Sequence, residues 1–184
     1  MQRPSSNHYS VLNHETNRPI IIAALIALGL GITARHLFPP AEKTAVSPLP
    51  DFNLADLSGR QHSIFEWQGK LLVINLWATW CPSCLKEIPD FIALQEQYEA
   101  QGVQFIGIAL EDREPVSAYT ATAKINYPVL LGGDHGITLA YQLGNRVGTI
   151  PYTLVVNRQG QIIHRHPGEF SKGQIVEIIT PLLN

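Results

Sequence analysis

The stretch "LLVINLWATWCPSCLKEIP", residues 71–89, decides the fold of this 184-residue chain. Residues 70–78 form an uninterrupted apolar run, which is typical of a strand buried on both faces of a parallel sheet. Apolar residues then recur at helical spacing over residues 82–101, with Leu85, Ile88 and Ile92 on one stripe. Proline is favoured at the first position of a helix, so Pro82 predicts that the strand passes directly into a helix.

Both cysteines of the chain, Cys81 and Cys84, lie at this junction. The unpaired N–H groups and the dipole of a helix N-terminus stabilise an anion by about 0.3–2 kcal/mol. That effect lowers the pKa of a thiol by about one unit. We therefore expect Cys81 to be the attacking thiolate and Cys84, one turn further in, to be the more buried resolving thiol.

Other readings of the cysteine pair are less favoured. A structural disulfide usually joins distant segments, and a pair three residues apart adds little stability. A zinc site would need two more ligands, for which His164 and His166, alternating onto one face of a strand, are the paired candidates. Histidines on a surface strand are more often solvated. A peroxidase is also disfavoured, because it would place a single reactive cysteine in an apolar pocket.

Strands and helices alternate along the rest of the chain. A three-layer α/β domain with a mixed sheet is therefore predicted. Its expected elements are a hairpin over residues 51–64, a buried strand at 103–110, a helix at 114–125, a short strand at 127–131, a helix at 135–144, a hairpin from 152–157 to 161–166, and a closing helix at 171–184 with Ser171 as its N-cap.

Four segments are expected along the chain: a polar segment (1–18), a membrane anchor (19–38), a proline-rich linker (39–50) and the folded domain (51–184). The apolar run from Pro19 to Ala34 carries no charge and, as a helix, rises roughly 24 Å against about 30 Å of hydrocarbon. A cleaved signal peptide and a buried core helix are the alternatives. Charges flanking the run do not fix its orientation.

Taken together, residues 71–89, 103–112 and 147–170 resemble the TlpA/ResA-like membrane-anchored thiol–disulfide oxidoreductases of the thioredoxin superfamily. The resemblance covers about 51–184. It implies a thioredoxin-like three-layer fold, in which helices flank a mixed central sheet. It also implies an N-terminal hairpin and a helix and strand inserted within residues 114–131.

The same resemblance assigns roles at the site. Cys81 is the nucleophile, Cys84 resolves the mixed disulfide, and Pro151 matches the cis-proline that faces the pair and leaves the preceding backbone free for a substrate strand. An ordinary strand-start proline is the alternative for Pro151, and a half-buried aromatic is the alternative for Trp80. The residues expected to contact substrate are Trp80, Pro82, Ser83, Thr149, Ile150 and Pro151.

One departure from thioredoxin concerns a buried acid, which thioredoxin carries six residues before its first cysteine. Asn75 occupies that position here and cannot take a proton. The resemblance points instead to Glu111, just after the second core strand. Parallel strands present functional groups at their carboxyl ends, so Glu111 is expected near the cysteines, where it could accept the proton of Cys84. A plain surface carboxylate is the alternative, and Asp112 fits that description.

The resemblance implies a single-pass inner-membrane protein whose catalytic domain lies in the periplasm, outside the cytoplasmic membrane. There the domain is expected to reduce the disulfides of other proteins. Its expected partners are disulfide-containing clients and a membrane-embedded thiol donor, in cytochrome c maturation or in copper delivery to an oxidase. No metal or organic cofactor is required. The formal charge of −2 gives no reason to expect nucleic acid. An oxidant that forms disulfides and a metal-binding module are the alternatives.

Overall fold

The computed structural model describes Ile22 and residues 46–183. The polar segment 1–18, the rest of the predicted anchor 19–38 and most of the linker 39–50 lie outside the described residues. Within the described part, no helix has the length and apolar character of a membrane span. Residues 44–184 make up one compact unit, and the folded domain falls inside it.

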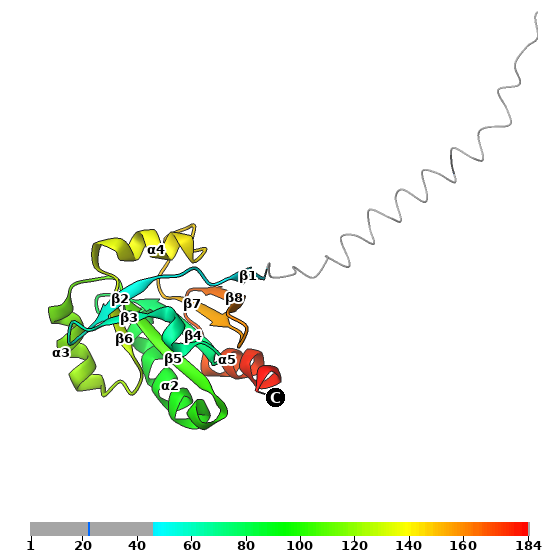
Figure 1. Ribbon diagram of the computed structural model, residues 1–184, viewed down its shortest axis with the longest axis horizontal. Helices are drawn as coiled ribbons and strands as arrows, with labels where there is room; N and C mark the ends of the chain where they lie inside the picture. The colour runs from blue at the N-terminus through cyan, green and yellow to red at the C-terminus, as the bar shows by residue number, and fades with distance from the viewer. Residues whose placement is uncertain (1–21, 23–45, 184) are drawn as a thin grey trace, which may run out of the picture. The chain divides into compact units, whose positions relative to one another are not determined.

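Two parallel strands form the centre of the sheet, β4 (Leu71–Trp77) and β5 (Val103–Ala109). Every residue of both strands is buried, which explains why their sequences are almost entirely apolar rather than alternating, with Asn75 and Gln104 as the polar exceptions. A third parallel strand, β6 (Val129–Leu131), pairs with the carboxyl half of β5. The strands predicted near 70–78, 103–110 and 127–131 are therefore confirmed (Figure 1).

Antiparallel strands complete the sheet on both sides, in the order β1-β8-β7-β4-β5-β6-β2-β3. The mixed sheet was expected. The two hairpins lie close to where the sequence predicted them: β2 (Asn53–Asp56) with β3 (Gln61–Ser63), and β7 (Tyr152–Val156) with β8 (Gln161–Pro167).

The first strand, β1 (Ser47–Pro48), was not predicted. It pairs with β8, and the next residue, Leu49, is buried and donates its N–H to Gly160 O at 2.9 Å. The end of the predicted linker is therefore part of the sheet. The domain begins a few residues before Asp51, because the edge of β8 offers backbone partners that the proline-rich sequence does not reveal.

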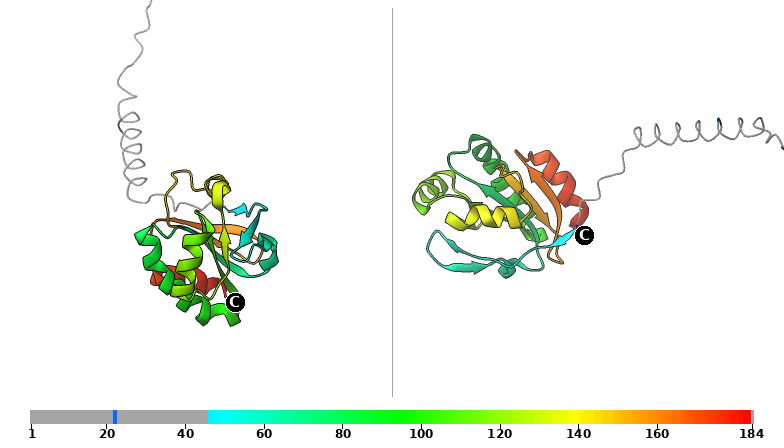
Figure 2. Two further views of the ribbon diagram at one scale, coloured as in Figure 1. Left: turned by 90° about the vertical axis from the view of Figure 1, so that its left-hand side faces the viewer. Right: turned by 90° about the horizontal axis from the view of Figure 1, so that it is seen from above.

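Helices cover both faces of the sheet and give the predicted three layers. One face carries α2 (Pro82–Tyr98), α3 (Arg113–Ala123) and α5 (Lys172–Ile179), and the other carries α4 (Gly136–Gln142) with the 3-10 turn Ile64–Trp67. The left view of Figure 2 shows α4 (yellow) and α5 (red) on opposite sides. Further 3-10 turns span Glu99–Gln101, Gly133–His135 and Thr180–Leu182.

The buried stripe of α2 differs from the predicted one. Leu85 and Ile92 are only partly buried, whereas the residues that point fully inward are Cys84, Glu87, Ile88, Phe91, Leu94, Gln95 and Tyr98. The inward-facing stripe contains Cys84, as its expected burial requires, and is rotated by about one residue from the predicted stripe, because Leu85 and Ile92 lie at its border. The correction brings Glu87 onto the inner face.

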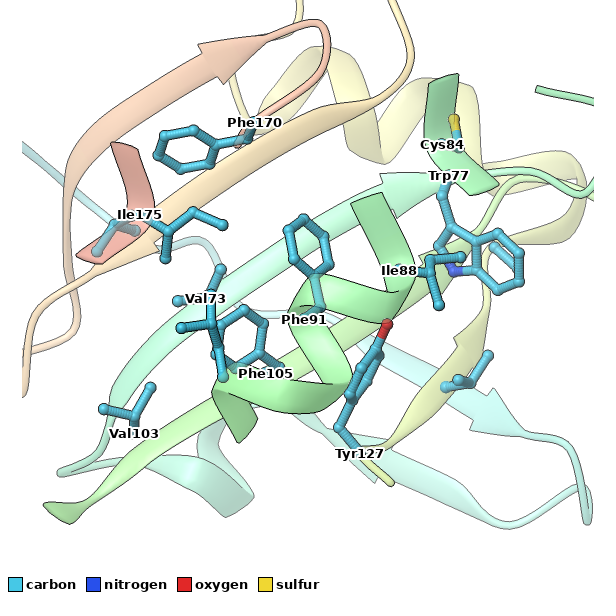
Figure 3. Packing of buried hydrophobic residues seen from close by; sticks show 14 of the residues in the cluster. Val73, Trp77, Cys84, Ile88, Phe91, Val103, Phe105, Tyr127, Phe170 and Ile175 are labelled. Carbon is cyan, nitrogen blue, oxygen red and sulfur yellow. The ribbon is translucent and has the colours of Figure 1, made fainter. Parts of the chain in front are cut away.

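Aromatic rings fill the core between α2 and the sheet (Figure 3). Phe105 lies 5.5 Å from Phe91 and 6.1 Å from Tyr127, measured between ring centroids. The indole of Trp77 lies so close to β5 that a Cβ added at Gly107 would sit 2.9 Å from Trp77 Nε1. Glycine is therefore required at position 107 by close packing.

We predict that Gly107→Ala lowers the free energy of unfolding by about 1–3 kcal/mol, because the added methyl group overpacks a rigid core. Urea titration measures this as a lower midpoint with an unchanged slope. Gly173→Ala is the control, since no atom lies within 4 Å of a Cβ at that position in α5, and its midpoint should not fall. Equal midpoints for Gly107→Ala and the unaltered protein would refute the close contact.

Candidate active site

The two cysteines are joined in a disulfide at the start of α2. Cys81 is the N-cap residue of the helix, and Pro82 occupies its first turn, as the sequence predicted. The sulfur of Cys81 accepts the N–H of Cys84 at 3.3 Å and lies 3.4 Å from the hydroxyl of Ser83. Cys81 is 5% exposed and Cys84 is fully buried, which is the order expected for an attacking and a resolving thiol. Trp80 is 67% exposed rather than half-buried.

Glu111 lies at the turn that leads into the cysteines. Its carboxylate accepts the N–H of Thr79 and, at 2.9 Å, the hydroxyl of the same residue. These bonds tie the end of β5 to the turn between β4 and α2. The sequence placed Glu111 near the pair, and it does contact this turn. No hydrogen bond joins Glu111 to Cys84 among the described residues, and proton transfer between these two groups stays a prediction.

A second glutamate, which the sequence analysis missed, lies inside the molecule. Glu87 is 2% exposed. One carboxylate oxygen accepts the side-chain amide of Asn75 at 2.7 Å, and the other accepts the N–H of Phe170 at 2.9 Å. Burial raises the pKa of Glu87 to about 7; the two hydrogen bonds act in the opposite direction, and nearby Glu169 adds a small further increase. Glu87 can therefore gain or lose a proton near neutral pH.

The place of Glu87 in the sequence contains a usable signal. It follows Cys84 by three residues, which puts it one turn along the same face of the helix. Asn75 also donates to the hydroxyl of Thr153 on β7, at 3.0 Å. At the position where thioredoxin has its acid, this protein has an amide that holds a carboxyl from the facing helix.

The cis peptide bond between Ile150 and Pro151 lies immediately before β7. Since Tyr152 pairs with Leu76, this peptide bond lies at the carboxyl end of β4, where the chain leads to the cysteines. The backbone of Thr149 is not free, because its N–H and C=O both bond to the side chain of Asn145, at 3.1 and 2.7 Å. By contrast, the N–H and C=O of Ile150 have no hydrogen-bond partner in the described domain. Sequence reasoning missed Asn145, because only the fold brings it into place.

His164 and His166 do not form a metal site with the cysteines. Their rings stack on Phe170, with centroids 5.6 and 4.2 Å away, and His166 Nε2 lies 3.0 Å from the C=O of Glu169. Among residues 46–183, no group of three or more histidine, cysteine, aspartate or glutamate side chains is placed to hold a metal ion. The two histidines serve as packing partners at the start of α5.

The redoxin family model matches residues 44–179. This chain belongs to the redoxin family. The redoxin is 31% identical over 169 residues to the thiol-disulfide oxidoreductase ResA of Geobacillus thermodenitrificans, covering 88% of this chain and 93% of the relative. It is 26% identical to ResA of Bacillus subtilis, over 85% and 86% of the two chains.

A solved structure supports the same assignment. The thiol:disulfide interchange protein of Chlorobium tepidum superposes on the redoxin with a TM-score of 0.67 and 30% identity, over 75% of this chain and 97% of that one. The predicted TlpA/ResA-like family and thioredoxin-like fold are confirmed. With its cysteine pair at the helix terminus, the redoxin is a thiol–disulfide oxidoreductase.

We predict that Glu87 makes the stability of the redoxin fall as the pH rises. Its pKa is about 7 in the folded protein against 4.5 as a free group, so the folded state binds more protons between these values. The free energy of unfolding should therefore decline from pH 4.5 to pH 7, by roughly 3 kcal/mol from this group. Urea titrations across that range measure the decline.

Glu87→Gln should remove this part of the pH dependence, although it also weakens the bond from Phe170 and lowers stability at every pH. The shape of the curve, rather than its height, is therefore the quantity to compare. Parallel curves for the variant and the unaltered redoxin would show that Glu87 does not titrate in this range.

Proposed function

We propose that the redoxin reduces disulfides of client proteins outside the cytoplasmic membrane, with Cys81 as nucleophile and Cys84 as resolving thiol. One observation carries the proposal. The cysteine pair begins α2 at the same edge of the sheet where Ile150 has an unpaired backbone N–H and C=O. A client segment that pairs with Ile150 would bring its disulfide to the sulfur of Cys81. Trp80 and Pro82, both exposed, border that approach.

The exchange takes two steps. The thiolate of Cys81 attacks one client sulfur, a bond forms between them, and the second client sulfur leaves as a thiolate that takes up a proton. Cys84 then loses its proton and attacks the sulfur of Cys81. This attack releases the reduced client and leaves the Cys81–Cys84 disulfide. Two electrons have passed to the client, and a dithiol donor must return them.

Glu87 is the group best suited to receive the proton of Cys84. It lies one turn further along the buried face of α2, and its pKa of about 7 lets it accept and release protons at neutral pH. Glu111 has another task in this scheme. By holding Thr79, it fixes the turn that carries Cys81, so it acts as a positioning residue.

The charges around the pair support reduction rather than oxidation. Strong oxidants of this superfamily owe their potential to a stabilised reduced form. Here Pro82 and Ser83, between the cysteines, carry no positive charge, so the thiolate of Cys81 gains no stabilisation from them beyond that of the helix N-terminus. This absence supports a lower reduction potential than that of such oxidants. A disulfide-forming oxidant remains the second candidate, since the same residues serve both directions.

The location and partners are part of the same proposal. The uncharged run from Pro19 to Ala34 supports an uncleaved anchor over 19–38, and an anchored domain suits a membrane-embedded thiol donor. Clients in cytochrome c maturation or in assembly of a copper-containing oxidase follow from the TlpA/ResA-like resemblance. A relative named ResA supports the exchange chemistry, and the pathway is an analogy.

The reduction potential of the Cys81–Cys84 pair tests the direction of electron flow. We expect the full chain, equilibrated with defined thiol buffers, to have a midpoint of about −220 mV or lower. A midpoint near −120 mV would overturn the reductant role and favour the oxidant. Alkylation of the free thiols, followed by mass analysis, gives the oxidised fraction at each buffer ratio.

Cys84→Ala should accumulate client proteins as mixed disulfides on Cys81, because the resolving thiol is absent. Gel electrophoresis without reductant would detect them as adducts that disappear when a thiol is added. Cys81→Ala is the matched control and should give few adducts, since Cys84 is fully buried. Adducts in Cys81→Ala at the level of Cys84→Ala would contradict the assignment of the nucleophile.

A further inference from the structure

A groove of about 380 Å³ lies between α4 and the loop that leads to the cis peptide bond. Three of its lining residues are large apolar side chains exposed to solvent: Ile137 (75% exposed), Tyr141 (64%) and Val147 (78%). Monomeric proteins seldom gather such side chains at one place without a use for them. The family fold does not by itself require these side chains, since Ile137 and Tyr141 point away from the core that Leu139 and Ala140 of the same helix fill.

The groove adjoins the backbone of Ile150, with which a client segment is proposed to pair. Ile150, with its unpaired backbone groups, is one of its walls, and Leu110 is another. The N–H of Leu110 donates to the C=O of Trp77 at 2.9 Å, at the end of the strand that leads to the cysteines. The clamp of Asn145 on Thr149 fixes the loop between α4 and Ile150. The groove is therefore held in place at the end of the sheet where β4 leads to the cysteines.

A single charged side chain lines this groove. Arg146 is its one charged lining residue, and no carboxylate lines it. The guanidinium is exposed and makes no hydrogen bond or ion pair with any other residue in the described part of the chain. The nearest acid in sequence to the lining residue Leu110 is Glu111, whose carboxylate is occupied by Thr79. The groove thus combines apolar side chains with an exposed cation that has no protein partner among the described residues.

We propose that this groove selects clients whose disulfide is flanked by an apolar side chain next to an aspartate or glutamate. The apolar side chain fills the groove of Ile137, Tyr141 and Val147, and the carboxylate pairs with Arg146. This inference rests on the proposed exchange reaction and specifies its substrate class. Burial of a leucine supplies about tenfold selectivity over serine, and an exposed ion pair supplies up to about fivefold.

The test uses the reduced full chain and four peptides. Each peptide holds one cysteine in a mixed disulfide with 2-mercaptoethanol, flanked by Leu-Asp, Leu-Lys, Ser-Asp or Ser-Lys, with the pair placed before the cysteine in one set and after it in another. The change in tryptophan fluorescence in a stopped-flow instrument gives the rate constant for each. In one of the two sets, Leu-Asp should react fastest, about fivefold faster than Leu-Lys and about tenfold faster than Ser-Asp. Added salt should reduce the first ratio.

Two variants test the residues. Arg146→Glu should invert the ratio of Leu-Asp to Leu-Lys, and Ile137→Ser should bring the ratio of Leu-Asp to Ser-Asp close to one. Because each readout is a ratio, a general loss of activity in a variant cancels. Lys124→Glu is the matched control for the charge change. Lys124 is exposed and lies before the amino end of β6, whereas Leu110 follows the carboxyl end of the parallel strand β5, so this substitution should leave both ratios unchanged.

Failure of the exchange reaction and failure of selection by the groove give different results. If bis(2-hydroxyethyl) disulfide and all peptides fail to react, the proposed exchange function is wrong. If they all react at equal rates, exchange stands and the groove does not select. A dimer in sedimentation experiments that Ile137→Ser dissociates would assign the groove to a second copy of the chain, and would overturn the client proposal.

Discussion

The buried carboxyl of Glu87 joins the three parts of the fold that carry the site. It accepts hydrogen bonds from Asn75 in the central strand β4 and from the backbone of Phe170 before α5, while its own helix begins at the cysteines. Burying this carboxyl group without hydrogen-bond donors would lower the free energy of unfolding of the domain. The arrangement therefore fixes the first turns of α2 against the sheet, and it places a titratable group one turn along the helix from Cys84. The packing of α2 and the pKa of Glu87 both depend on these two hydrogen bonds.

The cysteine pair and the unpaired backbone of Ile150 lie at the same end of two neighbouring strands. The sulfur atoms lie at the end of β4, and the unpaired backbone of Ile150 lies at the start of β7, which pairs with β4. Each part has its own clamp, because Thr79 is held by Glu111 and Thr149 is held by Asn145. Glu111 joins the end of β5 to the turn before α2, whereas Asn145 closes its own loop onto Thr149 four residues later. The edge is thus preorganised for an extended segment, whichever direction the electrons take.

The sequence predicted those features that depend on local pattern or on neighbours along the chain. Apolar runs identified β4 and β5. The preference of proline for the first turn of a helix identified Pro82 as the start of α2, and thereby placed both cysteines at the helix N-terminus. Features created by distant pairing were missed. The sequence analysis assigned no role to Glu87, and it placed Ser47–Pro48 in the linker. The sequence around Asn145 also did not predict its hydrogen bonds to Thr149, which depend on the conformation of the loop at Gly148.

The pairing of β1 with β8 determines where the domain is attached to the chain before it. Ser47 lies opposite Ile162, which is level with Leu72 at the start of β4, whereas the cysteines follow the far end of that strand. A pull on the chain from the N-terminal side would thus act on the end of the sheet remote from the sulfur atoms. Such a load would be borne by the pairing of β1 with β8 and would not pass through the turn that carries Cys81.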